Sequence, residues 1–222
     1  MIHIIRHKDY DFPIPSGYVT CEVGPLFKGD RPNINELNPI INELTGIYDV
    51  WKNFDDEIVG FCHYHRFFMD KKGNVSDLWW DLRTWFYPYG GDETYDIIVP
   101  YNVTYPDMTI RESLEKDFRE DLPTFNKYMD MLYEAEPGLK EYFDGRTFHP
   151  RNMFVCRRAL LNEYCNWLFP LIIPIAERFK AEDFNKYHHY YSRMIGFIAE
   201  RLMTYFILKN GYSFMELPYN EF

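Results

Sequence analysis

Short apolar runs alternate along this chain with longer segments in which apolar residues recur at helical spacing. The short runs have the length of buried strands, and they cover residues 2–5, 58–62, 96–100 and 153–156. Strands that alternate with helices are typical of a mostly parallel sheet packed against helices. We therefore predict an α/β fold with a mostly parallel central sheet flanked by helices, in a single domain over residues 1–222.

Helix end signals define the longer segments. The first predicted helix begins at Asn38, a good N-cap residue, and its apolar stripe continues to Trp51. Thr109 and Glu112 have the spacing of a capping box, and Gly211 is a C-cap signal. The other predicted helices cover residues 109–119, 124–134, 160–179 and 188–209, whereas the Pro- and Gly-rich segment 10–32 is predicted to be a surface loop.

The apolar strand at 58–62 leads into His63, Tyr64, His65 and Arg66. Open α/β sheets bind their ligands at the carboxyl ends of strands, so this cluster is a candidate site. If the strand continues, the two histidines point to one face and could bind zinc or iron with a third ligand. Without a metal, they form with Arg66 a cationic group suited to diphosphate oxygens. The alternative is a hydrogen-bonded core histidine and a surface ion pair.

The last predicted helix carries a polar stripe. His189, Arg193, Gly196 and Glu200 are spaced i, i+4, i+7 and i+11, which places them on one side of a helix. A glycine inside a helix costs about 1 kcal/mol relative to alanine, and the close approach of another group would explain it. We therefore favour a cleft wall over a solvent-exposed face. A buried Glu200 beside Arg193 would be an oriented base, and a solvated ion pair is the alternative.

Two further groups of polar residues adjoin predicted strands. His149, Arg151 and Asn152 precede the strand at 153–156, and His7 and Lys8 follow the strand at 2–5. The second group occupies the place where nucleotide-binding α/β folds make their first contacts. The chain has no GxGxxG, Walker P-loop or GxSxG motif, so a Rossmann dehydrogenase, a P-loop ATPase and a serine hydrolase are not indicated.

Composition narrows the function classes. A formal net charge of -10 argues against a nucleic-acid partner, because phosphate neutralisation needs a basic face. Nineteen Phe, 19 Tyr and 5 Trp suit a packed core and stacking surfaces. The 4 cysteines form no CxxC pair and are interpreted as reduced thiols of a cytoplasmic protein. The N-terminus does not resemble a signal peptide, and the apolar run at 167–176 is shorter than the roughly 20 residues of a membrane span.

Several segments resemble a known family. NINELNP at 33–39, NELTGIYDVWKN at 42–53 and VGFCHYHRFF at 59–68 strongly resemble the bacterial family of proposed exopolysaccharide, capsular and lipopolysaccharide glycosyltransferases, long classed as a domain of unknown function. The family pattern reads N-I-S-x-x-N-P, E-L-T-x-x-Y-W-x-W-K-N and G-x-x-H-Y-R-R-Y. Further matching segments lie at 7–13, 152–169 and 192–202, so that the resemblance covers nearly the whole chain. His65 departs from the usual arginine and Asp49 from the usual tryptophan.

The resemblance implies a GT-A-like nucleotide-binding domain that transfers a sugar from a nucleotide-sugar donor to a surface glycan. Carried over by position, the donor side consists of His7, Lys8, Asn35, Trp51, Lys52, Asn53, His63 and Arg66, and the opposite wall of Asn152, Arg193, Glu200 and Arg201. His65, His149 and His189 complete the predicted substrate-binding set. The acceptor would be a glycan or a lipid-linked glycan, and a lipid-linked acceptor would bring the protein into peripheral contact with the cytoplasmic face of the inner membrane.

The chain has no Asp-x-Asp motif after the strand at 58–62, where GT-A enzymes commonly hold a metal. We therefore predict no cofactor and expect Arg66, with His63 and Lys8, to stabilise the diphosphate directly. Glu200 is the candidate base if the reaction inverts the anomeric centre. A divalent metal such as manganese is the alternative for the diphosphate.

Two other functions compete with glycosyl transfer. The first is a metal-dependent hydrolase that uses His63, His65 and one of His188, His189 or His149. The second is a non-catalytic protein that binds a nucleotide or a glycan.

Overall fold

A mixed eight-stranded sheet is the framework of the computed structural model, which describes residues 1–222 except 10, 12, 70–85, 87–93, 188, 189 and 222. The main strands lie in the order β2-β1-β3-β8-β5-β9. They are β1 (Ile2–Arg6), β2 (Tyr18–Glu22), β3 (Ile58–His63), β5 (Ile97–Pro100), β8 (Phe154–Arg157) and β9 (Phe214–Leu217). All run in one direction except β8, which is antiparallel to β3 and β5. The predicted α/β fold with a mostly parallel sheet is confirmed.

Short strands extend this sheet. β4 (Arg66–Phe68) forms a hairpin with the end of β3, and β10 (Tyr219–Glu221) pairs antiparallel with β4. β6 (Val103–Thr104) and β7 (Thr147–Phe148) form a separate two-stranded ladder.

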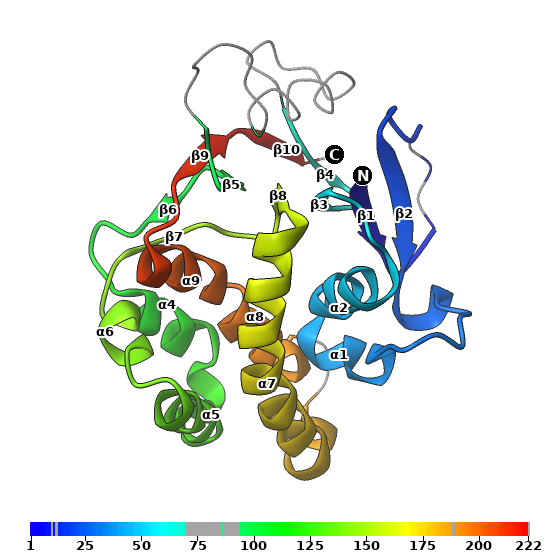
Figure 1. Ribbon diagram of the computed structural model, residues 1–222. Coiled ribbons are helices and arrows are strands. Elements are labelled where there is room, and N and C mark those ends of the chain that lie inside the picture. Colours follow the sequence, from blue (N-terminus) through cyan, green and yellow to red (C-terminus); the bar gives the residue numbers. More distant parts are fainter. Residues whose placement is uncertain (10, 12, 70–85, 87–93, 188–189, 222) are drawn as a thin grey trace.

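The helices lie below the sheet in Figure 1, with α7 crossing the middle of the view. The α-helices are α1 (Asn38–Ile41), α2 (Leu44–Asn53), α4 (Ile110–Asp117), α5 (Leu122–Ala135), α6 (Leu139–Phe143), α7 (Arg158–Glu182), α8 (Met194–Ala199) and α9 (Leu202–Asn210). Short 3-10 turns are η1 (Gly24–Leu26), η2 (Asn35–Leu37), η3 (Arg119–Asp121), η4 (Phe184–Lys186) and η5 (Tyr191–Arg193).

Both faces of the sheet are buried. In β3, Val59 and Phe61 point into the larger core, which the helices complete. Ile58 and Cys62 point into a smaller core on the other face, to which β4 and Phe86 contribute. A strand buried on both faces reads as a continuous apolar run, which is why the sequence pattern located β1, β3, β5 and β8.

The longest described helix, α7, contains Pro170 and Pro174 and occupies the predicted 160–179 segment. By length and composition alone it could cross a membrane. Half of its most apolar window is buried in the structure, whereas Asn162, Glu163 and Glu177 on its outer side are polar and exposed. These features are those of a core helix that packs against α5 and α2.

The loop predicted over 10–32 contains a strand, so that prediction is wrong for β2. Gly17 and Gly24 flank β2 with positive φ angles of 83° and 60°. The glycines of these turns give the segment the sequence pattern of a loop. The strand itself depends on parallel pairing with β1 along its whole length, which the local sequence does not reveal.

Two predicted helices are divided. Asn42, with φ 52°, separates α1 from α2. The 188–209 segment forms η5, α8 and α9, with residues 188 and 189 outside the described part of the chain. Two end signals are confirmed, because Thr109 and Glu112 form a capping box and Gly211 adopts a left-handed φ of 69°. The prediction for Asn38 is wrong, since Asn38 is the first helical residue of α1 and Leu37 is its N-cap.

The burial of His3 leads to a prediction of how the stability of the protein changes with pH. The His3 side chain is buried, 3.1 Å from the Asp56 carboxylate, and burial lowers its pKa to about 4. Unfolded histidine binds protons more readily, so the stability from neutral His3 is complete above pH 6.5 and is lost as the pH falls toward 4. The predicted loss is about 3 kcal/mol. Urea unfolding at pH 7 and 4.5 should show a smaller loss in His3→Gln than in the wild type. Equal losses in both proteins would contradict this assignment.

Candidate functional site

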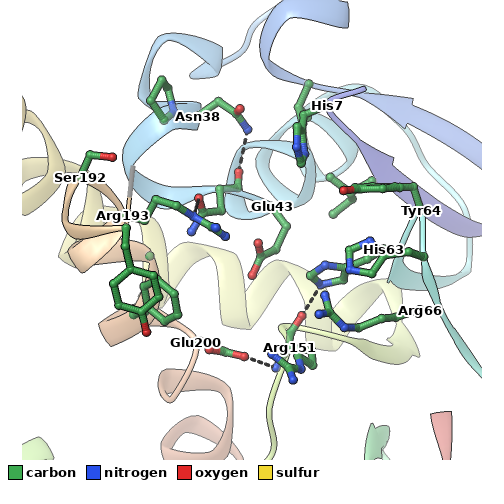
Figure 2. Close-up of a pocket in the computed structure, with 18 residues that line it drawn as sticks. His7, Asn38, Glu43, His63, Tyr64, Arg66, Arg151, Ser192, Arg193 and Glu200 are labelled. Carbon is green, nitrogen blue, oxygen red and sulfur yellow. Dashed lines mark hydrogen bonds between the residues drawn. The ribbon is translucent and has the colours of Figure 1, made fainter. Parts of the chain in front are cut away.

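A cavity of about 680 Å³ lies at the carboxyl ends of β1 and β3 (Figure 2). Its walls come from the ends of these strands, the α1–α2 junction, the β3–β4 turn, η5 and α8, so that segments far apart in sequence meet there. The described lining residues are Ile5, His7, Val23, Asn38, Pro39, Asn42, Glu43, His63, Tyr64, His65, Arg66, Arg151, Tyr190, Ser192, Arg193, Gly196, Phe197 and Glu200.

The histidine-arginine cluster spans a hairpin. β3 ends at His63, Tyr64 and His65 form the turn, and Arg66 opens β4 opposite His63. The two histidines therefore do not share one strand face as predicted, although their ring centroids lie 6.1 Å apart. His63 Nε2 lies 2.5 Å from the Arg151 carbonyl oxygen. Because a carbonyl only accepts, Nε2 carries a proton and donates it to this bond.

Positive charges gather around His7. Desolvation lowers the pKa of His7, and the charges of Lys8 and Arg193 lower it further, while Glu43 acts in the opposite direction. Lys8 is exposed and is not among the lining residues, and its Nζ lies 5.3 Å from the centroid of the Tyr64 ring. The lining carries three arginines against the two carboxylates of Glu43 and Glu200, so the cavity is locally cationic within a chain whose formal net charge is -10.

The opposite wall is formed by η5 and α8. Arg193 Nε donates to Asn42 Oδ1 at 2.8 Å. A Cβ atom on Gly196 would clash with the Asn42 side-chain amide and lie 2.9 Å from the Ile40 carbonyl oxygen. The predicted close approach at Gly196 is confirmed. Arg193, Gly196 and Glu200 line the cavity, as expected for a cleft wall.

Two carboxylates line the cavity. Glu200 Oε1 accepts the Arg151 backbone N–H at 2.5 Å, and its Oε2 accepts from Arg201 Nη1 at 2.5 Å. Glu43 Oε1 accepts from Asn152 Nδ2 at 2.7 Å. Asn152 and Arg201 are buried behind the lining, where they hold the two carboxylates.

Several predicted donor-side residues lie away from the cavity lining and make contacts that support the fold. Asn35 bonds to the backbone of Gly24, with Oδ1 2.6 Å from N and Nδ2 3.1 Å from O. Trp51 stacks on Phe169 with ring centroids 5.6 Å apart. Lys52 places Nζ 3.4 Å from the centroid of the Trp51 ring.

Asn53 and Asp49 belong to the same supporting layer. Asn53 Nδ2 donates to the Asp49 backbone and side-chain oxygens, both at 2.9 Å. Asp49 is buried and accepts two hydrogen bonds from Arg31, each at 2.7 Å. The aspartate that departs from the family pattern is therefore paired with an arginine outside the cavity lining.

His149 is also placed elsewhere. It is buried, its Nδ1 lies 2.9 Å from the Pro100 carbonyl oxygen, and burial lowers its pKa. His188 and His189 lie outside the described residues. Within the described part of the chain, no group of three or more His, Cys, Asp and Glu side chains is arranged to hold a metal.

Several lining residues were not identified from the sequence, among them Glu43, Asn38, Asn42 and Tyr190. Glu43 and Asn42 lie in the segment 42–53, which matches the family pattern. That match is the signal in the sequence that could have identified them as site residues. The break at Asn42 brings Asn42 against Arg193 and Gly196, and Glu43 bonds to Asn152.

Comparisons with known proteins agree with this fold. A family profile described as "Domain of unknown function (DUF4422)" matches residues 1–211. The apo structure of the bifunctional glycosyltransferase WbbM superposes with a TM-score of 0.75 at 22% sequence identity. The match covers 99% of this chain and 45% of that one, so this chain spans less than half of the WbbM length. No curated protein sequence matches the chain. At this identity the structural match establishes the fold.

Gly196 gives a test of the packing between α8 and α1. Replacing glycine by alanine within a helix usually stabilises a protein by about 0.4–1 kcal/mol. Gly196→Ala should instead destabilise by about 1–3 kcal/mol, because the added methyl group meets the backbone of Ile40. Denaturant unfolding measures the difference, and a more stable variant would contradict the packing described here.

Proposed function

The chain belongs to the family described as the domain of unknown function DUF4422, and from its fold and cavity we propose that it is a glycosyltransferase that uses a nucleotide-sugar donor. The membership confirms the family recognised from the sequence motifs. One observation carries the proposed activity. Three arginines and three histidines line one cavity at the carboxyl ends of parallel strands, in a chain of net charge -10: Arg66, Arg151, Arg193, His7, His63 and His65.

The diphosphate of the donor fits the three arginines of this lining, and the histidine rings offer further hydrogen bonds. Arginine presents a planar fork of donors that matches phosphate oxygens, and charge-assisted bonds of this kind are about twice as strong as neutral ones. Arg66 and His63 face each other across the β3–β4 hairpin, which holds them at the strand ends where open α/β sheets bind ligands. A cavity of about 680 Å³ falls within the size range of small-molecule sites.

Aromatic rings on two sides of the cavity supply flat surfaces for the base and the sugars. Tyr64 lies on the β3–β4 side, beside His7 at a centroid distance of 5.3 Å. Tyr190 and Phe197 lie on the α8 side, with centroids 4.7 Å apart. We assign the Tyr64 side to the donor and the Tyr190 side to the acceptor.

We propose that the basic side chains neutralise the leaving diphosphate without a resident metal. The lining supports this, because Arg66, Arg151 and Arg193 can donate charge-assisted hydrogen bonds to diphosphate oxygens. Manganese held between the diphosphate and Glu43 or Glu200 is the alternative. One of these two carboxylates takes the proton of the acceptor hydroxyl.

The finer assignment rests on the family resemblance. It implies a surface glycan or a lipid-linked glycan as acceptor, and a cytoplasmic protein with peripheral contact to the inner membrane. The structural neighbour is described as a bifunctional glycosyltransferase, which supports glycosyl transfer in general.

Nucleotide binding tests this proposal. Calorimetric titration with UDP, GDP, CDP and dTDP should show selective binding of one diphosphate that persists in EDTA. Binding only with added manganese would retain the glycosyltransferase and discard the metal-free site. Failure of every nucleotide to bind in either condition would overturn the proposed function.

Arg66 should account for much of that affinity. Arg66→Gln should weaken binding of the selected diphosphate about 10- to 100-fold, because it removes a charge-assisted contact of about 1.5–3 kcal/mol. Arg178→Gln is the matched control, since Arg178 is half exposed on α7 and pairs with Glu182 at 3.0 Å. Thermal unfolding should show both variants folded. Equal affinity in the two variants would remove Arg66 from the site.

A further inference from the structure

We propose that Glu43 is the general base that accepts the acceptor proton, with Asn152 as its positioning residue and Glu200 as a fixed ion-pair partner. This inference rests on the proposed glycosyl transfer and names the residue that drives it. Glu43 and Glu200 are the carboxylates among the described lining residues, and their surroundings differ in a way that separates their roles.

Glu200 already uses both of its carboxylate oxygens. One accepts the backbone N–H of Arg151, and the other accepts from the buried Arg201 guanidinium, each at 2.5 Å. Arg201 also donates to the Phe197 carbonyl oxygen at 2.8 Å. Protonating Glu200 would weaken a nearly buried ion pair, a change that opposes its use as a base. With this geometry, Glu200 holds the Arg151 turn in place.

Glu43 is held on one side only. Its Oε1 accepts from the neutral Asn152 amide at 2.7 Å, and within the described part of the chain Oε2 makes no hydrogen bond. Figure 2 shows the side chain projecting from the α1–α2 junction into the cavity, flanked in that view by Arg193 and His63. One oxygen therefore fixes the carboxylate while the other is available for a proton.

The Asn152 contact is built into the backbone. Asn152 is buried and has φ 49°, and it follows Arg151 with φ 78°. Positive φ is uncommon outside glycine, although asparagine tolerates it better than most residues. Asn152 Oδ1 is buried without a partner among the described residues, so the bond to Glu43 is what orients this amide. An amide N–H donated to Oε1 fixes the carboxylate and leaves Oε2 turned to the cavity.

The chemical step balances with these groups. As the acceptor hydroxyl oxygen bonds to the anomeric carbon of the donor sugar, its proton passes to Glu43 Oε2. The bond from the anomeric carbon to the diphosphate oxygen breaks, and the nucleoside diphosphate leaves with the electron pair. Arg66 and its neighbours stabilise the charge on the leaving group. Attack opposite the leaving group inverts the anomeric centre, and Glu43 then releases its proton to solvent.

The test compares the same substitution at both carboxylates. The nucleotide sugar is the one whose diphosphate binds most tightly, and the assay measures release of nucleoside diphosphate with water and with octyl glycosides as acceptors. Glu43→Gln should lower the rate about 10²- to 10⁴-fold and leave the diphosphate Kd within threefold. Glu200→Gln should lower the rate less than Glu43→Gln and should lower the unfolding temperature, because it breaks the ion pair with Arg201.

The outcomes are distinguishable. A larger rate loss in Glu200→Gln than in Glu43→Gln, with both variants folded, would overturn the assignment, as would a Glu43→Gln rate within tenfold of wild type. A Glu43→Gln variant that loses diphosphate binding together with rate would make Glu43 a donor-binding residue and would also overturn it. If the wild type binds no nucleotide, the proposed function itself fails.

Discussion

The turn at Arg151 and Asn152 makes the hydrogen bonds on which the cavity depends. Its backbone carbonyl binds His63, its backbone N–H binds Glu200, and the Asn152 amide binds Glu43. The turn reaches these groups because β8, which follows it, runs antiparallel to β3. The approach to β8 therefore lies at the carboxyl end of β3. If β8 were parallel to β3, it would begin at the amino end of β3. The turn that precedes β8 would then lie too far away to bind these three side chains.

Much of the fold could be predicted from local pattern because burial imposes that pattern. β3 packs Val59 and Phe61 into one core and Ile58 and Cys62 into the other, and the resulting apolar run is visible in the sequence. β9 begins with an exposed Phe214 and continues half-buried, and it is held by parallel pairing with β5. Edge strands of this kind gain their stability from pairing partners distant in sequence, so a local pattern does not identify them.

The candidate site likewise contains residues with a local sequence signature and residues that only the fold brings into the cavity. Arg66, Arg193 and Gly196 could be predicted, because a strand end and a helical glycine leave local signatures. The position of Glu43 in the cavity could not be predicted from spacing, since it depends on the positive φ of Asn42 and on the Asn152 amide more than a hundred residues away. Glu200 lines the cavity, and only the structure reveals that Arg151 and Arg201 occupy its oxygens.

The contrast between an acidic chain and a basic cavity has a physical consequence for the choice of ligand. At physiological salt, charges more than about 8 Å apart in solvent are largely screened, so an anion inside the cavity interacts chiefly with the arginines and histidines that line it. A long polyanion must also lie along the surface, where a net charge of -10 opposes it. A compact diphosphate fits inside the cavity and interacts chiefly with the charges that line it. The same charge distribution that argues against nucleic-acid binding thus favours a small phosphorylated donor.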